Sequence, residues 1–127
     1  MRKLLLILLP LLLCACQKTE NLYCTVQARV ELPDGANAIS ITIDPSLEGN
    51  RFQNINTLEC VPFPVFVNNA ASLRVLKGLY TVAFDGEALF ADGTTRKVRC
   101  TAHNTQTKSV TLTADSQELV LPVTYLK

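Results

Sequence analysis

Thiols and a single imidazole are the side chains of this chain with the most reactive chemistry. The sequence contains five cysteines and one histidine. A thiolate beside a histidine base can act as a nucleophile, and thiols also bind metals or form disulfides. Cys100 and His103 are close in sequence, but in a regular strand side chains three residues apart leave on opposite faces. We therefore predict no Cys–His catalytic pair, no enzyme activity, and a solvated-loop position for His103.

Metal chemistry is also not expected. Structural zinc takes four ligands at close spacing, commonly with a Cys-x₂-Cys pair. No such pair occurs in the sequence after Cys16. The sequence therefore predicts no metal site and no cofactor.

The first two cysteines belong to a targeting pattern. Arg2 and Lys3 precede an apolar run over residues 4–13, about half of the ~20 residues that a membrane-spanning helix needs and typical of a signal-peptide h-region. The run leads into Leu-Cys-Ala-Cys, ending at Cys16. This segment resembles the lipobox of bacterial lipoprotein signal sequences. The resemblance implies cleavage before Cys16, diacylglycerol on its thiol and acylation of its new amino group.

This resemblance divides the chain into a signal peptide (1–15), a lipidated N-terminus and tether (16–22) and a folded domain (23–127). Acyl chains attach a protein firmly, because each buried CH₂ contributes about 0.8 kcal/mol. The Cys-Gln-Lys start at Cys16 is similar to that of surface-exported lipoproteins of Bacteroidota, and it lacks the aspartate of inner-membrane retention signals. We expect an outer-membrane lipoprotein, with the periplasmic and the surface face both open. A secretory signal cut at the same place, leaving a soluble protein, is the alternative.

Length and charge restrict the function classes further. The chain has 127 residues, with 12 Lys and Arg against 11 Asp and Glu, so that its net charge is +1. This is one domain without the basic excess of nucleic-acid-binding proteins. The absence of Trp argues against a glycan-stacking platform. The expected partners are the membrane, through the lipid on Cys16, and an outer-membrane receptor or other envelope protein.

Alternation of apolar and polar residues fills the folded domain. Residues 24–32 alternate strictly, with Cys24 and every second residue after it on one face. This pattern is typical of a half-buried strand. Shorter runs of the same kind predict strands over 39–43, 72–76, 79–84, 87–91, 96–102, 110–112 and 119–125. No helix is expected after the signal, and we predict an all-β fold: a single antiparallel β-sandwich of about seven or eight strands, with a closed barrel as the competitor.

Turn residues and prolines predict how these strands connect. The Pro-Asp-Gly turn at 33–35 is compatible with a hairpin of the first two strands or with their placement in opposite sheets. Asp85-Gly86 is expected to break a strand, and 46–53 to form a loop. Two prolines within 60–67 remove ladder donors, so this segment is predicted to be an edge strand or an extended connection.

A second resemblance concerns the sandwich itself. Residues 30–35 end a strand in Pro-Asp-Gly, residues 39–43 read Ile-Ser-Ile-Thr-Ile, and residues 77–82 contain Gly-Leu-Tyr-Thr-Val. These segments are similar to carboxypeptidase-regulatory-like or prealbumin-like modules. The resemblance implies a seven-stranded sandwich without an active site.

Two further sites are expected in the domain. Three cysteines remain after Cys16 is lipidated, and of their three pairings we favour Cys60–Cys100, a bridge that would stabilise by roughly 3–4 kcal/mol. Three free thiols packed as small hydrophobes are the alternative. Phe63 and Phe66, with the prolines beside them, form either an exposed ledge for docking a protein or a cap on the core.

Two functions remain. The first is a non-enzymatic lipoprotein that acts as a binding or accessory module of a cell-envelope complex. The second is a structural component of a surface fibre or assembly that acts by β-strand pairing, with 60–67 or 119–126 as the exposed edge.

Overall fold

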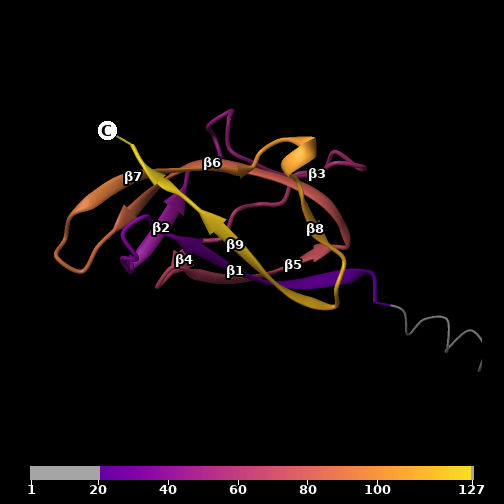
Figure 1. Ribbon diagram of the computed structural model, residues 1–127, viewed down its shortest axis with the longest axis horizontal. Coiled ribbons are helices and arrows are strands. Elements are labelled where there is room, and N and C mark those ends of the chain that lie inside the picture. The colour runs from indigo at the N-terminus through magenta and orange to yellow at the C-terminus, as the bar shows by residue number, and fades with distance from the viewer. Residues whose placement is uncertain (1–20, 127) are drawn as a thin grey trace, which may run out of the picture.

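The computed structural model describes residues 21–126 and shows an all-β domain (Figure 1). The signal peptide, Cys16 and most of the tether lie outside the described residues. The elements are β1 (Tyr23–Glu31), β2 (Ser40–Ile43), β3 (Arg51–Asn54), β4 (Phe66–Val67), β5 (Ala70–Leu76), β6 (Gly78–Leu89), β7 (Thr95–His103), the 3₁₀ helix η1 (Gln106–Lys108), β8 (Val110–Leu112), β9 (Ser116–Pro122) and β10 (Thr124–Tyr125).

All ten strands belong to one sheet, in the order β10-β7-β6-β2-β4-β5-β1-β9, with β3 and β8 also paired to β6. The 12-residue β6 is the longest strand. Along one edge it pairs first with β3 and then with β2, and along the other with β8 and then β7. The sheet is therefore built around β6.

The two ends of the sheet meet in the C-terminal segment, where β9 and β10 follow each other directly (Figure 1). β9 pairs with β1 in parallel, and β10 pairs with β7 in antiparallel fashion. Hydrogen bonds from Val123 N–H to Glu31 O (3.0 Å) and from Leu126 N–H to Lys97 O (2.9 Å) fix both junctions. The predicted all-β fold is confirmed, and its one mixed sheet, which includes the parallel β1–β9 pair, curls around a single core.

The core confirms the inward faces predicted from alternation. In β1 every second residue from Cys24 to Val30, and Leu32 after it, is at most 3% exposed. The aromatic rings of Phe52, Phe63, Tyr80 and Phe84 form a chain of tilted and edge contacts with centroids 5.2–6.1 Å apart. Burial of each such large apolar side chain stabilises the fold by about 1.5–3 kcal/mol.

Of the two arrangements left open for the first two strands, the hairpin is not formed, because β1 pairs with β5 and β9 whereas β2 pairs with β4 and β6. Two other predictions were wrong. Residues 46–53 are not entirely loop, because β3 begins at Arg51. Asp85-Gly86 does not break β6: Asp85 is bound to Arg99 across the sheet, and a Cβ at position 86 would lie 3.1 Å from Thr42 O. Glycine there permits close strand approach rather than a turn.

Candidate functional site

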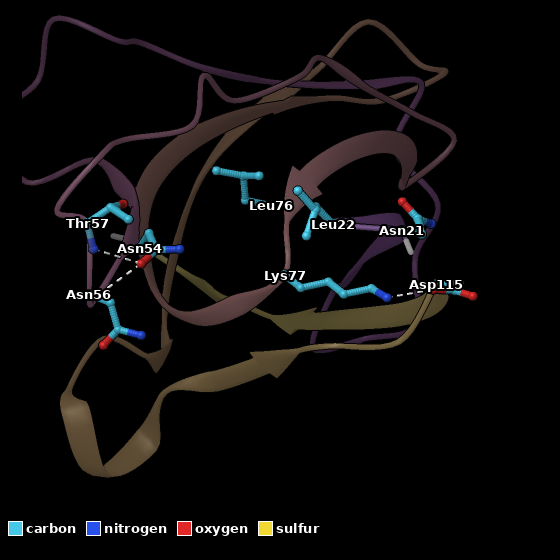
Figure 2. Close-up of a pocket in the computed structure, with 8 residues that line it drawn as sticks. All are labelled: Asn21, Leu22, Asn54, Asn56, Thr57, Leu76, Lys77 and Asp115. Atoms are coloured by element: carbon cyan, nitrogen blue, oxygen red, sulfur yellow. Dashed lines mark hydrogen bonds and ion pairs between the residues drawn. The ribbon is translucent and has the colours of Figure 1, made fainter. Parts of the chain in front are cut away.

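A hollow of the described domain lies at the end where the chain enters β1 (Figure 2). Its volume is about 680 Å³. Four segments far apart in sequence contribute its lining residues, which are Asn21, Leu22, Asn54, Asn56, Thr57, Leu76, Lys77 and Asp115. We call this the N-terminal pocket.

One wall of the N-terminal pocket is an ion pair. Lys77 Nζ donates to Asp115 Oδ1 at 2.6 Å (Figure 2), so the pair joins the residue between β5 and β6 to the β8–β9 turn. The Lys77 hydrogen bond and charge hold the pKa of Asp115 below its usual value. Asp115 is 75% exposed, so the pair contributes little stability. It presents one cation and one anion beside a solvent-accessible hollow.

The opposite wall is neutral. Asn54 is buried, and its Oδ1 accepts hydrogen bonds from the N–H groups of Asn56 and Thr57 at 2.9 and 3.0 Å. Leu22 and Leu76 add apolar surface. The pocket therefore offers amide, hydroxyl, charged and aliphatic contacts, which suit an amphipathic group.

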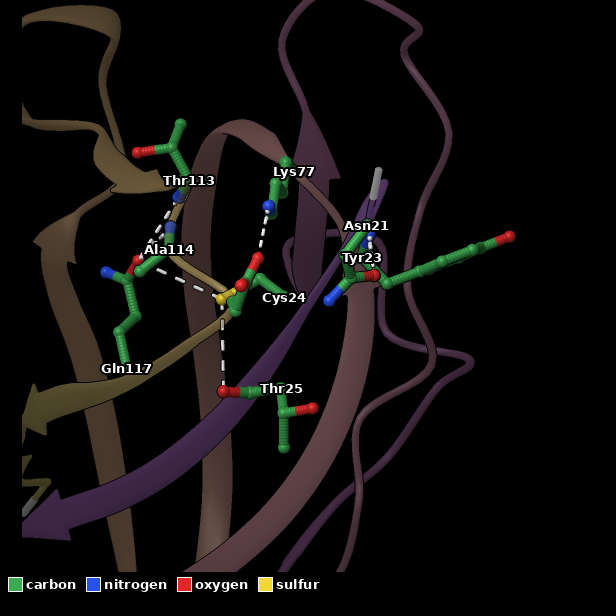
Figure 3. A network of polar contacts seen from close by, with 9 residues as sticks. Asn21, Tyr23, Cys24, Thr25, Lys77, Thr113, Ala114 and Gln117 are labelled. Atoms are coloured by element: carbon green, nitrogen blue, oxygen red, sulfur yellow. Dashed lines mark hydrogen bonds and ion pairs between the residues drawn. The ribbon is translucent and has the colours of Figure 1, made fainter. Parts of the chain in front are cut away.

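Near Lys77, Cys24 belongs to a network of polar contacts with Gln117, Thr113 and Ala114 (Figure 3). The Cys24 thiol is 3.8 Å from Gln117 Oε1, which also accepts from the N–H groups of Thr113 and Ala114. Burial raises the pKa of the Cys24 thiol, and the nearby Lys77 charge opposes this only in part. A thiol that stays protonated is a poor nucleophile, and Cys24 packs against the β8–β9 turn through Gln117.

The predicted Cys60–Cys100 disulfide is not formed. Cys24, Cys60 and Cys100 are free, with Cys60 exposed and Cys100 fully buried. Cys100 pairs with Phe84 in β6, whereas Cys60 forms an isolated bridge with Gln53. Desolvation raises the pKa of the Cys100 thiol. The alternative prediction of small hydrophobic thiols describes Cys24 and Cys100, but not Cys60.

The predicted ledge of Phe63 and Phe66 is also not exposed. Phe66 is 1% exposed, because it pairs with Ile41 on the inward face of β4. Phe63 is half-buried and packs on Phe52 and Phe84. These phenylalanines belong to the core, as the alternative reading proposed.

Exposed apolar residues instead lie on the outer face beside Phe66. Ser40 pairs with Val67 on one side and Leu89 on the other, so the side chains of these three residues share that face. Val67 is 58% exposed and Leu89 36% exposed. Ile39 directly precedes Ser40 and Val65 lies two residues before Val67, and these two residues are 45% and 56% exposed. We call these four apolar residues, Ile39, Val65, Val67 and Leu89, the apolar row.

The polar neighbours of His103 predict a solvated loop, and this prediction was wrong. His103 is the last residue of β7 and is half-buried. Its Nδ1 lies 3.3 Å from Lys108 O, and its Nε2 lies 3.2 Å from Val120 O. The ring thus connects β7 to η1 and β9 where the two ends of the sheet meet. Both nitrogens contact backbone carbonyls, which gives His103 a structural position.

Metal-binding groups and membrane-spanning helices were both sought in the described residues. No group of three or more His, Cys, Asp or Glu side chains within 21–126 is placed to hold a metal ion. In the same residues, no helix has the length and apolar character that crossing a membrane requires.

Comparison with known proteins gave no match: no protein-family model, no curated protein and no solved structure is significantly similar to this chain. The lipoprotein and carboxypeptidase-regulatory-like resemblances therefore stay predictions from the sequence.

Proposed function

We propose that the protein is a lipoprotein anchored in the outer membrane through Cys16, and that it serves as a non-enzymatic binding or accessory module of a cell-envelope complex. The membrane attachment rests on the charged, apolar and Leu-Cys-Ala-Cys segments of residues 2–16. The position of β1 supports it, because the first strand begins at Tyr23, directly after the proposed tether.

The apolar row is the observation that favours a binding module. β6 runs from Gly78, beside the N-terminal pocket, to Leu89 in the row. At about 3.3 Å per strand residue, the row lies some 30 Å or more from the pocket along this strand. In Figure 1 the described chain accordingly enters β1 from the right, whereas β2 and β4 lie towards the left. Four exposed aliphatic side chains at the end away from the anchor suit an apolar surface of an envelope protein.

A photo-crosslinking amino acid at position 67 tests this proposal in intact cells. The matched control places it at Gln27, which is exposed on the outer face of β1. We expect one defined adduct with an outer-membrane protein from position 67 and none from position 27, and we expect Leu89→Glu to abolish it. Equal adducts from both positions, or no effect of Leu89→Glu, would contradict a docking role for the row.

A specific observation also favours strand pairing, the second function. β5 pairs with β1 along its length, but on its other edge its strand partner within 21–126 is β4, at Ala70 alone. A hollow of about 220 Å³ lies between this edge and residues 60–62. Backbone groups alternate between strand edges. Val67 and Ala70 close the two-residue turn Asn68-Asn69, so the backbone N–H and C=O groups of Ala70 point towards β4. By alternation, the backbone groups of Ser72 and Arg74 point to the same edge, where no strand pairs with them in the described residues.

The edges predicted from sequence are less suited to strand pairing. β9 ends the strand order and pairs with β1 on one edge only, but His103 Nε2 contacts Val120 O within it. β10 pairs with β7, and residues 60–67 contribute only the two-residue β4. If β5 accepts a strand, Arg74→Pro will abolish fibre formation by removing an N–H donor, whereas Arg74→Ala will retain it. A protein that stays monomeric at high concentration, by light scattering and electron microscopy, would argue against this function.

A further inference from the structure

Three exposed apolar side chains gather where the chain enters the domain. Leu22 is 62% exposed, Tyr23 39% and Leu76 37%. Tyr23 and Leu76 are directly paired across β1 and β5, so their side chains share the outer face. Lys77 N–H donates to Leu22 O at 2.9 Å, which holds Leu22 beside Leu76. Figure 2 shows the side chains of Leu22 and Leu76 at the same pocket.

Two cations accompany these residues. The guanidinium carbon of Arg74 lies 4.2 Å from the ring centroid of Tyr23, within the range of a cation–π contact. The Lys77 ammonium is held at the pocket wall by Asp115. Leucine, tyrosine, lysine and arginine together are typical of surfaces that lie at a membrane–water interface, where aliphatic groups enter the lipid and charged groups stay at headgroup level.

The tether restricts what can cover this patch. Tyr23 follows Cys16 by seven residues in the sequence, and a fully extended chain spans at most about 3.6 Å per residue, or about 25 Å here. If Cys16 carries lipid, these side chains are held within that distance of the bilayer. Since the patch includes Leu22 and Tyr23, among the first described residues after Cys16, lipid is the surface that the anchor would bring within its reach.

We propose that Leu22, Tyr23 and Leu76, flanked by Arg74 and Lys77, form a membrane-contact patch that rests on the lipid leaflet holding the acylated Cys16. This inference depends on the proposed lipid anchor and adds an orientation to it. The N-terminal pocket faces lipid headgroups, and the apolar row, at the far end of β6, faces away from the bilayer. The domain is thus presented to partners in a fixed direction.

Tryptophan fluorescence tests the contact directly, because the natural chain contains no Trp. Leu76→Trp places a probe in the patch. Leu89→Trp is the matched control, since Leu89 is exposed to nearly the same extent (36% against 37%) at the other end of the sheet. The full-length lipidated proteins are reconstituted into vesicles of phosphatidylethanolamine and phosphatidylglycerol, with and without phospholipids brominated near the headgroup.

We expect the Leu76→Trp emission to shift to the blue in vesicles and to be quenched by bromine, while the Leu89→Trp emission changes little. Leu22→Trp, placed before β1, gives the same reading if position 76 does not tolerate the larger ring. Adding Leu22→Asp to Leu76→Trp is expected to reduce the quenching.

Vesicle flotation separates this inference from the anchor. Protein that floats with the vesicles but shows equal quenching at positions 76 and 89 would overturn the contact patch and leave the anchor intact. Protein that carries no lipid on Cys16 and does not float would overturn both. Quenching at position 89 alone would show the opposite orientation and would also overturn the patch.

Discussion

The Asn69 side chain forms two hydrogen bonds with the connection between β1 and β2. Its substitution gives a quantitative test of the fold. Its Oδ1 accepts a hydrogen bond from Ala38 N–H, and its Nδ2 donates to Ala36 O, both at 2.9 Å. Ala38 is fully buried, so losing its partner costs about 1–3 kcal/mol, and the second bond contributes about 0.5–1.5 kcal/mol. Asn69 also has a φ of 66°, where an alanine is strained by about 1–2 kcal/mol.

These contributions predict an ordered series of variants. Asn69→Gly loses the two side-chain bonds and destabilises by about 2 kcal/mol, whereas Asn69→Ala adds backbone strain and destabilises by about 3 kcal/mol. Asn68→Gly is the control, because Asn68 has a φ of 52° and is exposed, and we expect it to change stability by less than about 0.5 kcal/mol. Urea unfolding followed by circular dichroism measures each free energy. Equal losses for Asn69→Gly and Asn68→Gly would refute the argument that Asn69 fastens this connection.

Two further predictions concern titration and thiol reactivity. Hydrogen bonds from Arg99 lower the pKa of Asp85 in the folded protein. The stability that this pair adds is therefore present at neutral pH and is lost as pH falls below about 4. We expect the unfolding free energies of wild type and Asp85→Asn to converge on acidification, and a difference that stays constant with pH would contradict the pairing. Cys60 is exposed, whereas Cys24 and Cys100 are buried, so a maleimide should label Cys60 in the native protein and the other two only in urea. Rapid native labelling of Cys100, identified by peptide mass spectrometry, would show that its burial is wrong.

The strands with strong alternation could be predicted from sequence, because burial of one face imposes a period of two. Residues 24–32 illustrate this, since the predicted inward residues are all buried. β3 was missed because Phe52 and Asn54 are its only inward residues, too few for a period to be recognised. The break at Asp85-Gly86 was predicted from turn propensity, but cross-strand pairing with Arg99 overrides that propensity.

The sites were harder to predict for a different physical reason. The N-terminal pocket combines residues 21–22, 54–57, 76–77 and 115, and no local pattern indicates that these segments meet. The prediction of an exposed ledge at Phe63 and Phe66 was wrong because the sequence pattern of an apolar, proline-containing segment is the same whether its rings face the core or the solvent. Exposure of Val67 follows from its register with Ser40, which the sequence alone does not specify.

Intact-mass and N-terminal peptide analysis of the protein purified from membranes tests the lipid anchor most directly. We predict a mature chain that begins at Cys16 and carries a diacylglycerol on the thiol and an acyl group on the amine, and we predict that Cys16→Ser abolishes both the modification and the membrane association. A mature chain that begins at an unmodified Cys16, or at another residue, and is recovered in the soluble fraction would contradict the account.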